Sequence, residues 1–254
     1  MSGFSDYRKV SIERNHEHFV YEAMARDKNS LNFLLAASAL TVVLYFVPFA
    51  WILVYPFRLF VTFIHEGGHA LATLLTFGSV SEIYLHPDAS GETYTRGGFS
   101  LLIASAGYLS STAYGAGLLV LGQQGKRAKG VLALTAAAIL VLTGLYVKGL
   151  FGWLVGIGLT IGLAFVVIAA STQVAHFVVS FLAVQCCLNA LYDLNTLFLI
   201  SAVSRTPSDA RNMQDYTGLP ALFWAVLWLA ISIIVLVQSL RKYASRSGGK
   251  PARP

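Results

Sequence analysis

The residue types best suited to chemistry lie in one short segment, His65-Glu66-x-x-His69, inside an apolar run. On a helix, residues four apart stack on one face, so both imidazoles can bind one metal ion. Glu66 lies about 100° around such a helix from His65. There it can take a proton from water at the metal without displacing a ligand. The pattern predicts a hydrolytic metal centre, and the expected cofactor is Zn2+.

A catalytic zinc ion usually has three protein ligands and one open position. Asp193 is the predicted third ligand, because it is the only acidic residue in the apolar run 173–200, where a charge is costly. Asn189 lies one turn earlier on the same face and is the predicted substrate-binding residue. Other candidate ligands remain. They are His176, about 25 Å from Asp193 along a straight helix, and three residues of the polar stretch after the motif: Glu82, His86 and Asp88.

The composition excludes an ordinary water-soluble domain. Hydrophobic residues make up 56% of the 254 residues and charged residues only 12%, which is about half the usual charged share. The net charge of +6 therefore indicates Lys and Arg at lipid headgroups rather than a nucleic-acid partner. The two cysteines, Cys186 and Cys187, are adjacent in an apolar run and imply no disulfide framework. We expect an integral, multi-pass membrane protein of the cell or plasma membrane.

The predicted fold class is an all-α polytopic bundle of about six or seven transmembrane helices, with one short β-hairpin after the motif helix. Alternating residues around the turn-rich segment 87–91 predict the hairpin within residues 79–98. Pro48, Pro56 and Arg58 predict a break between the first two spans. The apolar runs that predict spans are 31–54, 57–77, 99–121, 131–147, 149–170, 173–200 and 220–240.

Three parts of the chain differ in character. Residues 1–29 are polar and could include a short surface helix, residues 30–240 form the membrane domain, and the basic tail 241–254 is expected to be disordered. The polar loop 204–219 is interpreted as a connector without chemistry. With seven spans, Lys and Arg are equally numerous on the two sides, so the positive-inside rule does not orient the bundle.

The motif in a membrane helix, the hairpin after it and the distant Asn189-x-x-x-Asp193 helix resemble the site-2 protease family of intramembrane zinc metalloproteases. The compact form is most similar to its small B-type branch, over about residues 57–200. The resemblance implies that His65 and His69 bind zinc, that Glu66 activates water and that Asp193 completes the site. It also implies that the hairpin helps to hold an extended substrate and that the N-terminus is cytosolic.

The sequence departs from the family in two ways. Leu194 follows Asp193 where better-known members have a Leu-Asp-Gly setting, and no inserted regulatory domain is found. The first hypothesis is an intramembrane zinc metalloprotease that hydrolyses a membrane-spanning protein or peptide in the lipid bilayer. The alternative is a metal-binding membrane protein without proteolytic activity, such as a transporter, a sensor or an inactive relative. Glu66 favours the first, because hydrolysis needs a base beside the metal and transport rarely does.

Overall fold

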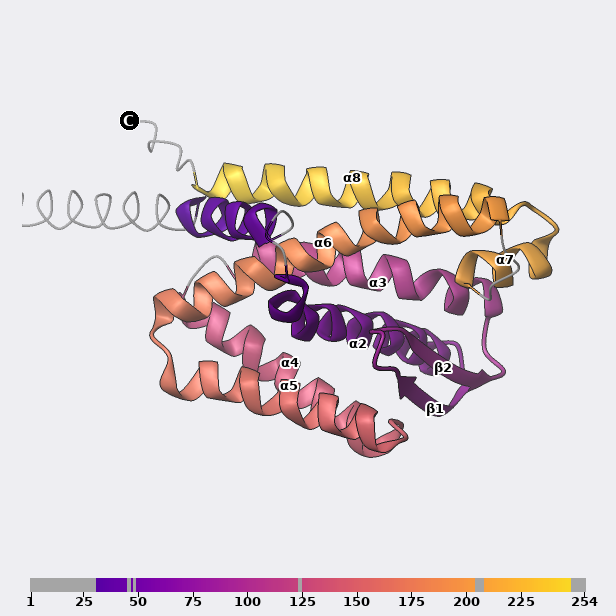
Figure 1. The fold of residues 1–254 in the computed structure, drawn as a ribbon, viewed down its shortest axis with the longest axis horizontal. Helices are drawn as coiled ribbons and strands as arrows, with labels where there is room; N and C mark the ends of the chain where they lie inside the picture. The colour runs from indigo at the N-terminus through magenta and orange to yellow at the C-terminus, as the bar shows by residue number, and fades with distance from the viewer. Residues whose placement is uncertain (1–30, 45–46, 48, 123–124, 204–207, 248–254) are drawn as a thin grey trace, which may run out of the picture.

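The computed structural model describes residues 31–44, 47, 49–122, 125–203 and 208–247, and for residues 51, 125–126, 189–203 and 246–247 it describes the backbone alone. The expectations for the N-terminal segment 1–29 therefore lie outside the described residues. Within them, nearly all of the chain is helical (Figure 1). The helices are Leu31–Leu44, α2 (Trp51–Leu75), α3 (Ser100–Leu121), α4 (Gly125–Leu145), α5 (Leu150–Ala169), α6 (Thr172–Val203), α7 (Asp209–Thr217) and α8 (Ala221–Ser247).

The predicted apolar runs coincide with helices, but several ends differ, and α4 already begins at Gly125 rather than at residue 131. The first break precedes Trp51, and Pro56 lies inside α2, where it removes one backbone hydrogen bond of the second turn without ending the helix. At the other end of the chain, α8 continues to Ser247. The first residues of the tail that was expected to be disordered are therefore helical.

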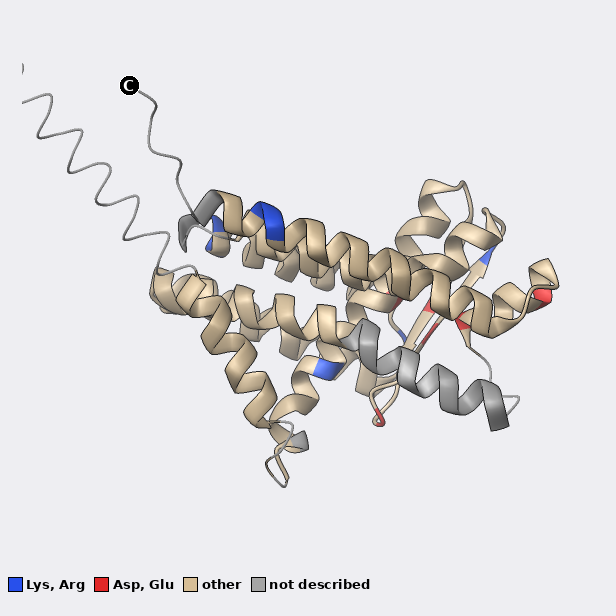
Figure 2. Cartoon of the chain, turned by 90° about the horizontal axis from the view of Figure 1, so that it is seen from above, with Lys and Arg blue, Asp and Glu red and all other residues tan. Residues whose placement is uncertain are grey.

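Three helices of the described part are long and apolar enough to cross a membrane: Arg127–Leu145, Leu150–Ala169 and Ala221–Ser245. They support a membrane protein, but the expected count of six or seven spans is not confirmed. The described acidic residues gather towards the end of the molecule that holds the hairpin and α7 (Figure 2). Of these, Glu66 is buried, at 4% exposure, and a buried carboxylate needs partners for its charge.

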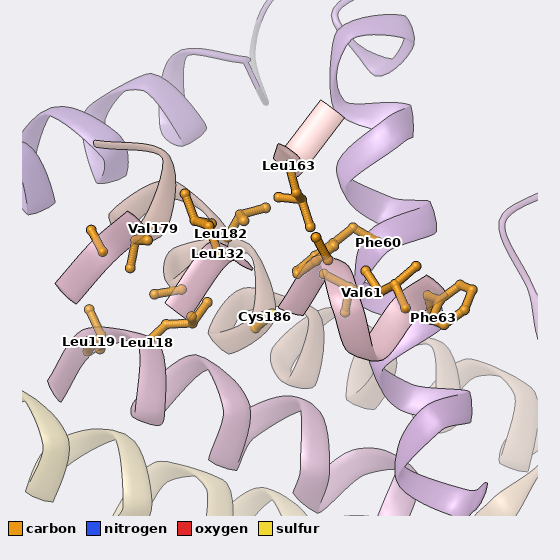
Figure 3. Packing of buried hydrophobic residues seen from close by; sticks show 14 of the residues in the cluster. Phe60, Val61, Phe63, Leu118, Leu119, Leu132, Leu163, Val179, Leu182 and Cys186 are labelled. Carbon is orange, nitrogen blue, oxygen red and sulfur yellow. The ribbon is translucent and has the colours of Figure 1, made fainter. Parts of the chain in front are cut away.

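Helix α3 lies at the centre of the bundle and packs against α2, α6 and α8, while α4 pairs with α5 on the other side of α2 (Figure 1). The main core is apolar and tightly buried, with Phe60, Leu118, Leu132 and Leu182 at 2% exposure or less (Figure 3). Burial of such side chains contributes about 1.5–3 kcal/mol each where the alternative is water. This core fixes α2 and α3 relative to one another.

The predicted hairpin is confirmed. Strand β1 (Ser79–Leu85) pairs antiparallel with β2 (Gly91–Arg96), from Ser79 opposite Arg96 to Leu85 opposite Gly91. On its other side β1 bonds to the connection between α4 and α5: Ile83 N donates to Tyr146 O, and Lys148 N donates to Ile83 O, both at 2.9 Å. Thus β1 is bonded on both edges, whereas the outer edge of β2 has no backbone partner among the described residues.

Candidate metal centre

The two motif histidines occupy one face of α2, as their spacing predicts. Their ring centroids are 4.9 Å apart, and their Nε2 atoms are 3.2 Å apart. Both side chains are largely buried, at 16% exposure for His65 and 9% for His69. They face α3 and α7, so the residues that complete the site come from those two helices rather than from α2.

Asp209, the first residue of α7, meets both histidines. Its Oδ2 lies 3.0 Å from His65 Nε2 and 3.2 Å from His69 Nε2. Burial raises the pKa of this carboxyl, but the two histidines lower it by more, so the pKa lies below its ordinary value. Among the described residues, these three side chains form the one group of His, Cys, Asp and Glu placed to hold a metal ion.

The group fits a zinc ion. Zinc–ligand distances of about 2.0–2.1 Å in a tetrahedral site place the ligand atoms about 3.3 Å from one another. The three separations here, 3.0, 3.2 and 3.2 Å, are close to that value. Two imidazole nitrogens and a carboxylate are also a ligand set that zinc commonly takes.

Gly107 lets the two histidine rings lie close against α3. A Cβ built on Gly107 would overlap Nε2 of both His65 and His69, and it would lie 2.6 Å from His65 Cε1. Both imidazoles can therefore hold these positions, with their two nitrogens turned to Asp209, only because residue 107 has no side chain.

The tautomer of His69 is set by a backbone group. Its Nδ1 lies 2.7 Å from the carbonyl oxygen of Ile103, and a carbonyl can only accept, so Nδ1 must carry the proton. In the neutral ring Nε2 then keeps its lone pair and points to Asp209. A metal-binding histidine commonly donates its other N–H in this way, which fixes the ring orientation.

Helix α7 presents Asp209 through local capping and a small apolar cluster. Ser208 caps the helix by accepting from Arg211 N at 3.3 Å, and an acid in the first turn suits the positive end of the helix dipole. Met213, one turn after Asp209, is 1% exposed and belongs to a buried apolar cluster that includes Trp228 of α8. A nine-residue helix is not stable alone, so this packing decides where Asp209 lies.

Glu66 lies on a different face of α2 and contacts the hairpin. Tyr55, Thr62 and Glu66 are seven and then four residues apart, the spacing of one helical face. Tyr55 donates to Pro87 O at 2.6 Å, Thr62 donates to Ala89 O at 2.7 Å, and Thr93 donates to Glu66 Oε2 at 2.7 Å. Helix α2 therefore presents its histidines to α3 and α7 and its carboxylate to the hairpin.

The structure brings together only part of the predicted set. His65 and His69 lie in the three-residue group, with Glu66 next to them on α2. The backbone of Asn189 and Asp193 belongs to α6, but their side chains lie outside the described residues. Asp193 as third ligand and Asn189 as substrate contact therefore stay predictions.

The other candidate ligands lie away from the group. His176 is buried against the ring of Phe33, with centroids 5.1 Å apart. Glu82 lies on β1, and His86 and Asp88 lie at the hairpin turn; none of the three belongs to the group with His65 and His69.

Sequence reasoning missed Asp209, which it placed in a connector. Ser208 followed by Asp209 is a recognisable helix start, and that signal predicts α7. It does not predict that the side chain of Asp209 reaches α2, because the two residues that meet, His65 and Asp209, are 144 positions apart.

The comparison with protein families agrees with the geometry. The model of the Peptidase M50B-like family matches residues 34–239, so the chain belongs to the Peptidase M50B-like family. This confirms the resemblance to the B-type branch of the site-2 proteases. No significant match to the chain was found among curated proteins or among solved structures.

Proposed function

We propose that the protein is a zinc-dependent intramembrane peptidase in which His65, His69 and Asp209 bind the metal and Glu66 is the general base. The observation that carries this proposal is that the three ligand atoms lie within 3.0–3.2 Å of one another. Two of these ligands are on α2, the helix that also bears Glu66. Membership of the family supports peptide hydrolysis as the reaction. The helices long enough to span a bilayer support a membrane-embedded substrate.

When bound, zinc supplies Lewis-acid activation of water and of the scissile carbonyl. The chain supplies the proton transfers: Glu66 accepts a proton from the attacking water and returns it to the leaving amine. Burial of Glu66 at 4% exposure and its hydrogen bond from Thr93 hold the carboxylate in one orientation. His69 is held by Ile103, so two of the functional side chains are fixed by contacts outside α2.

The open edge of β2 is where we expect the substrate to lie. A transmembrane helix has its carbonyls hydrogen bonded, so a substrate must unwind before it can be cleaved. An extended segment that adds to an open strand edge regains those backbone hydrogen bonds. Since β2 contacts Glu66, addition there brings the unwound segment to the base.

The test compares wild type with Glu66→Gln, using Glu92→Gln as the matched control because Glu92 is exposed on the hairpin. The probe is a labelled apolar peptide of about 20 residues, interrupted by Gly and Pro so that it unwinds, in proteoliposomes. We expect about one zinc ion per chain in all three proteins and cleavage by wild type and Glu92→Gln only.

Two results would contradict the proposal in different ways. Cleavage retained by Glu66→Gln would remove Glu66 as the base. Zinc bound by wild type without cleavage of the probe, together with metal flux that survives Glu66→Gln, would favour the metal-binding alternative. Absence of zinc from the folded wild type would remove the metal centre itself.

A further inference from the structure

Thr93 of β2 makes the hydrogen bond that holds the Glu66 carboxylate. Its Oγ1 donates to Glu66 Oε2 at 2.7 Å and lies 3.2 Å from the main-chain oxygen of the same residue. No other described side chain donates to this carboxylate. Because Glu66 is almost fully buried, little water is available to replace the bond, and its loss would leave the carboxylate free to rotate.

Gly91 brings the strand against the other carboxylate oxygen. A Cβ on Gly91 would lie 2.8 Å from Glu66 Oε1 and 2.7 Å from Glu66 Cγ, so only a glycine allows this approach. One oxygen of Glu66 is therefore held by the Thr93 hydroxyl while the other lies against the backbone of Gly91. The orientation of the carboxylate is determined by β2 and not by α2 alone.

The main-chain N–H and C=O of Thr93 point away from β1, towards the open edge of β2. Thr93 is paired with Ile83, and both main-chain groups of Ile83 bond to the segment 146–148. Residues opposite one another in an antiparallel pair exchange either both hydrogen bonds or neither. The N–H and C=O of Thr93 therefore point away from β1, to the edge that has no backbone partner among the described residues.

We propose that Thr93 is a positioning residue that joins the substrate-binding edge to the general base. Its hydroxyl orients Glu66, and its N–H and C=O are the groups to which an unwound substrate segment bonds. The inference rests on the proposed function for the substrate, but the contact between Thr93 and Glu66 stands on geometry.

The kinetic test uses Thr93→Val, which removes the hydroxyl at nearly constant volume, and Thr93→Ser, which keeps it. Thr95→Val is the matched control, because Thr95 lies two residues along the same strand face and makes no side-chain hydrogen bond to a described residue. With the peptide probe, we expect Thr93→Val to lower kcat by about tenfold or more. KM and zinc content should be unchanged, and Thr93→Ser should recover most of kcat.

If Thr93 had only a structural role, Thr93→Val would raise KM as well as lower kcat. Thr95→Val would then show the same two changes. That pattern, or wild-type kcat in Thr93→Val, would overturn the inference. Failure of Thr93→Ser to recover activity would overturn it as well.

Hydrogen exchange gives a readout without catalysis. In the zinc-loaded protein, Thr93→Val should speed exchange of the Glu92 and Tyr94 amides, which face β1, by about tenfold, whereas Thr93→Ser should not. Adding Glu66→Gln to Thr93→Val should cause little further change, because the hydrogen bond is already absent. Unchanged exchange in Thr93→Val would overturn the inference even if the protein is a peptidase. Faster exchange without any cleavage by wild type would keep the contact and remove the peptidase.

Discussion

The space at Gly107 gives the sharpest prediction about the metal centre. We expect Gly107→Ala to abolish zinc binding while leaving the bundle folded. The added methyl group would overlap Nε2 of both histidines and lie 2.6 Å from His65 Cε1. Ordinary contacts between such atoms begin near 3.4 Å, so the His65 ring would have to withdraw by about 0.8 Å, and the two nitrogens by more.

That displacement is large compared with the tolerance of a metal site. Metal–ligand distances vary by only about 0.2 Å between working sites. Loss of a supporting contact to a ligand already lowers metal affinity by about 10- to 100-fold. Zinc affinity should therefore fall by more than about 100-fold. Helix α3 itself should not be weakened, because alanine is favoured over glycine in a helix by about 1 kcal/mol.

The assay is zinc per chain in purified protein, followed by competition with a chelator of known affinity. Gly117→Ala is the matched control, since Gly117 is on the same helix and a Cβ there meets nothing within 4 Å. We expect wild-type zinc content in Gly117→Ala and none in Gly107→Ala, with similar thermal unfolding of the two metal-free proteins. Wild-type zinc affinity in Gly107→Ala would refute the placement of the ion between His65, His69 and α3.

Two further predictions concern α7. Asp209→Ala should lose zinc, whereas Asp193→Ala should retain it if Asp209 is the third ligand; the opposite result, measured as zinc per chain, would return that role to Asp193. Met213→Ala should cost about 2–5 kcal/mol of packing and weaken zinc binding without touching a ligand, because Met213 holds α7 in place. Tyr216→Ala, on the exposed side of the same helix, is its control, and equal zinc affinity in the two variants would show that α7 packing does not position Asp209.

The described part of the fold was largely predictable because its signals are local. Apolar runs separated by polar stretches predict the helices, and alternation around the turn at 87–91 predicts the hairpin. The break between the first two helices was predicted at residues 54–57, but α2 already begins at Trp51. A proline in the second turn of a helix is tolerated and does not mark a helix end. The number of membrane spans depends on how each helix is exposed in the assembled bundle, and local hydropathy does not settle it.

The sequence by itself determined the pairing of His65 with His69 and the position of Glu66 beside them, because the helical repeat fixes which residues share a face. Only the tertiary structure decided what those faces meet. Asp209 reaches the histidines because α7 packs on α3 and α8. The two imidazoles keep their positions because α3 has a glycine, Gly107, where it lies against them. Residue spacing determines geometry within one element, whereas a metal centre built from three helices depends on packing between them, which periodicity does not encode.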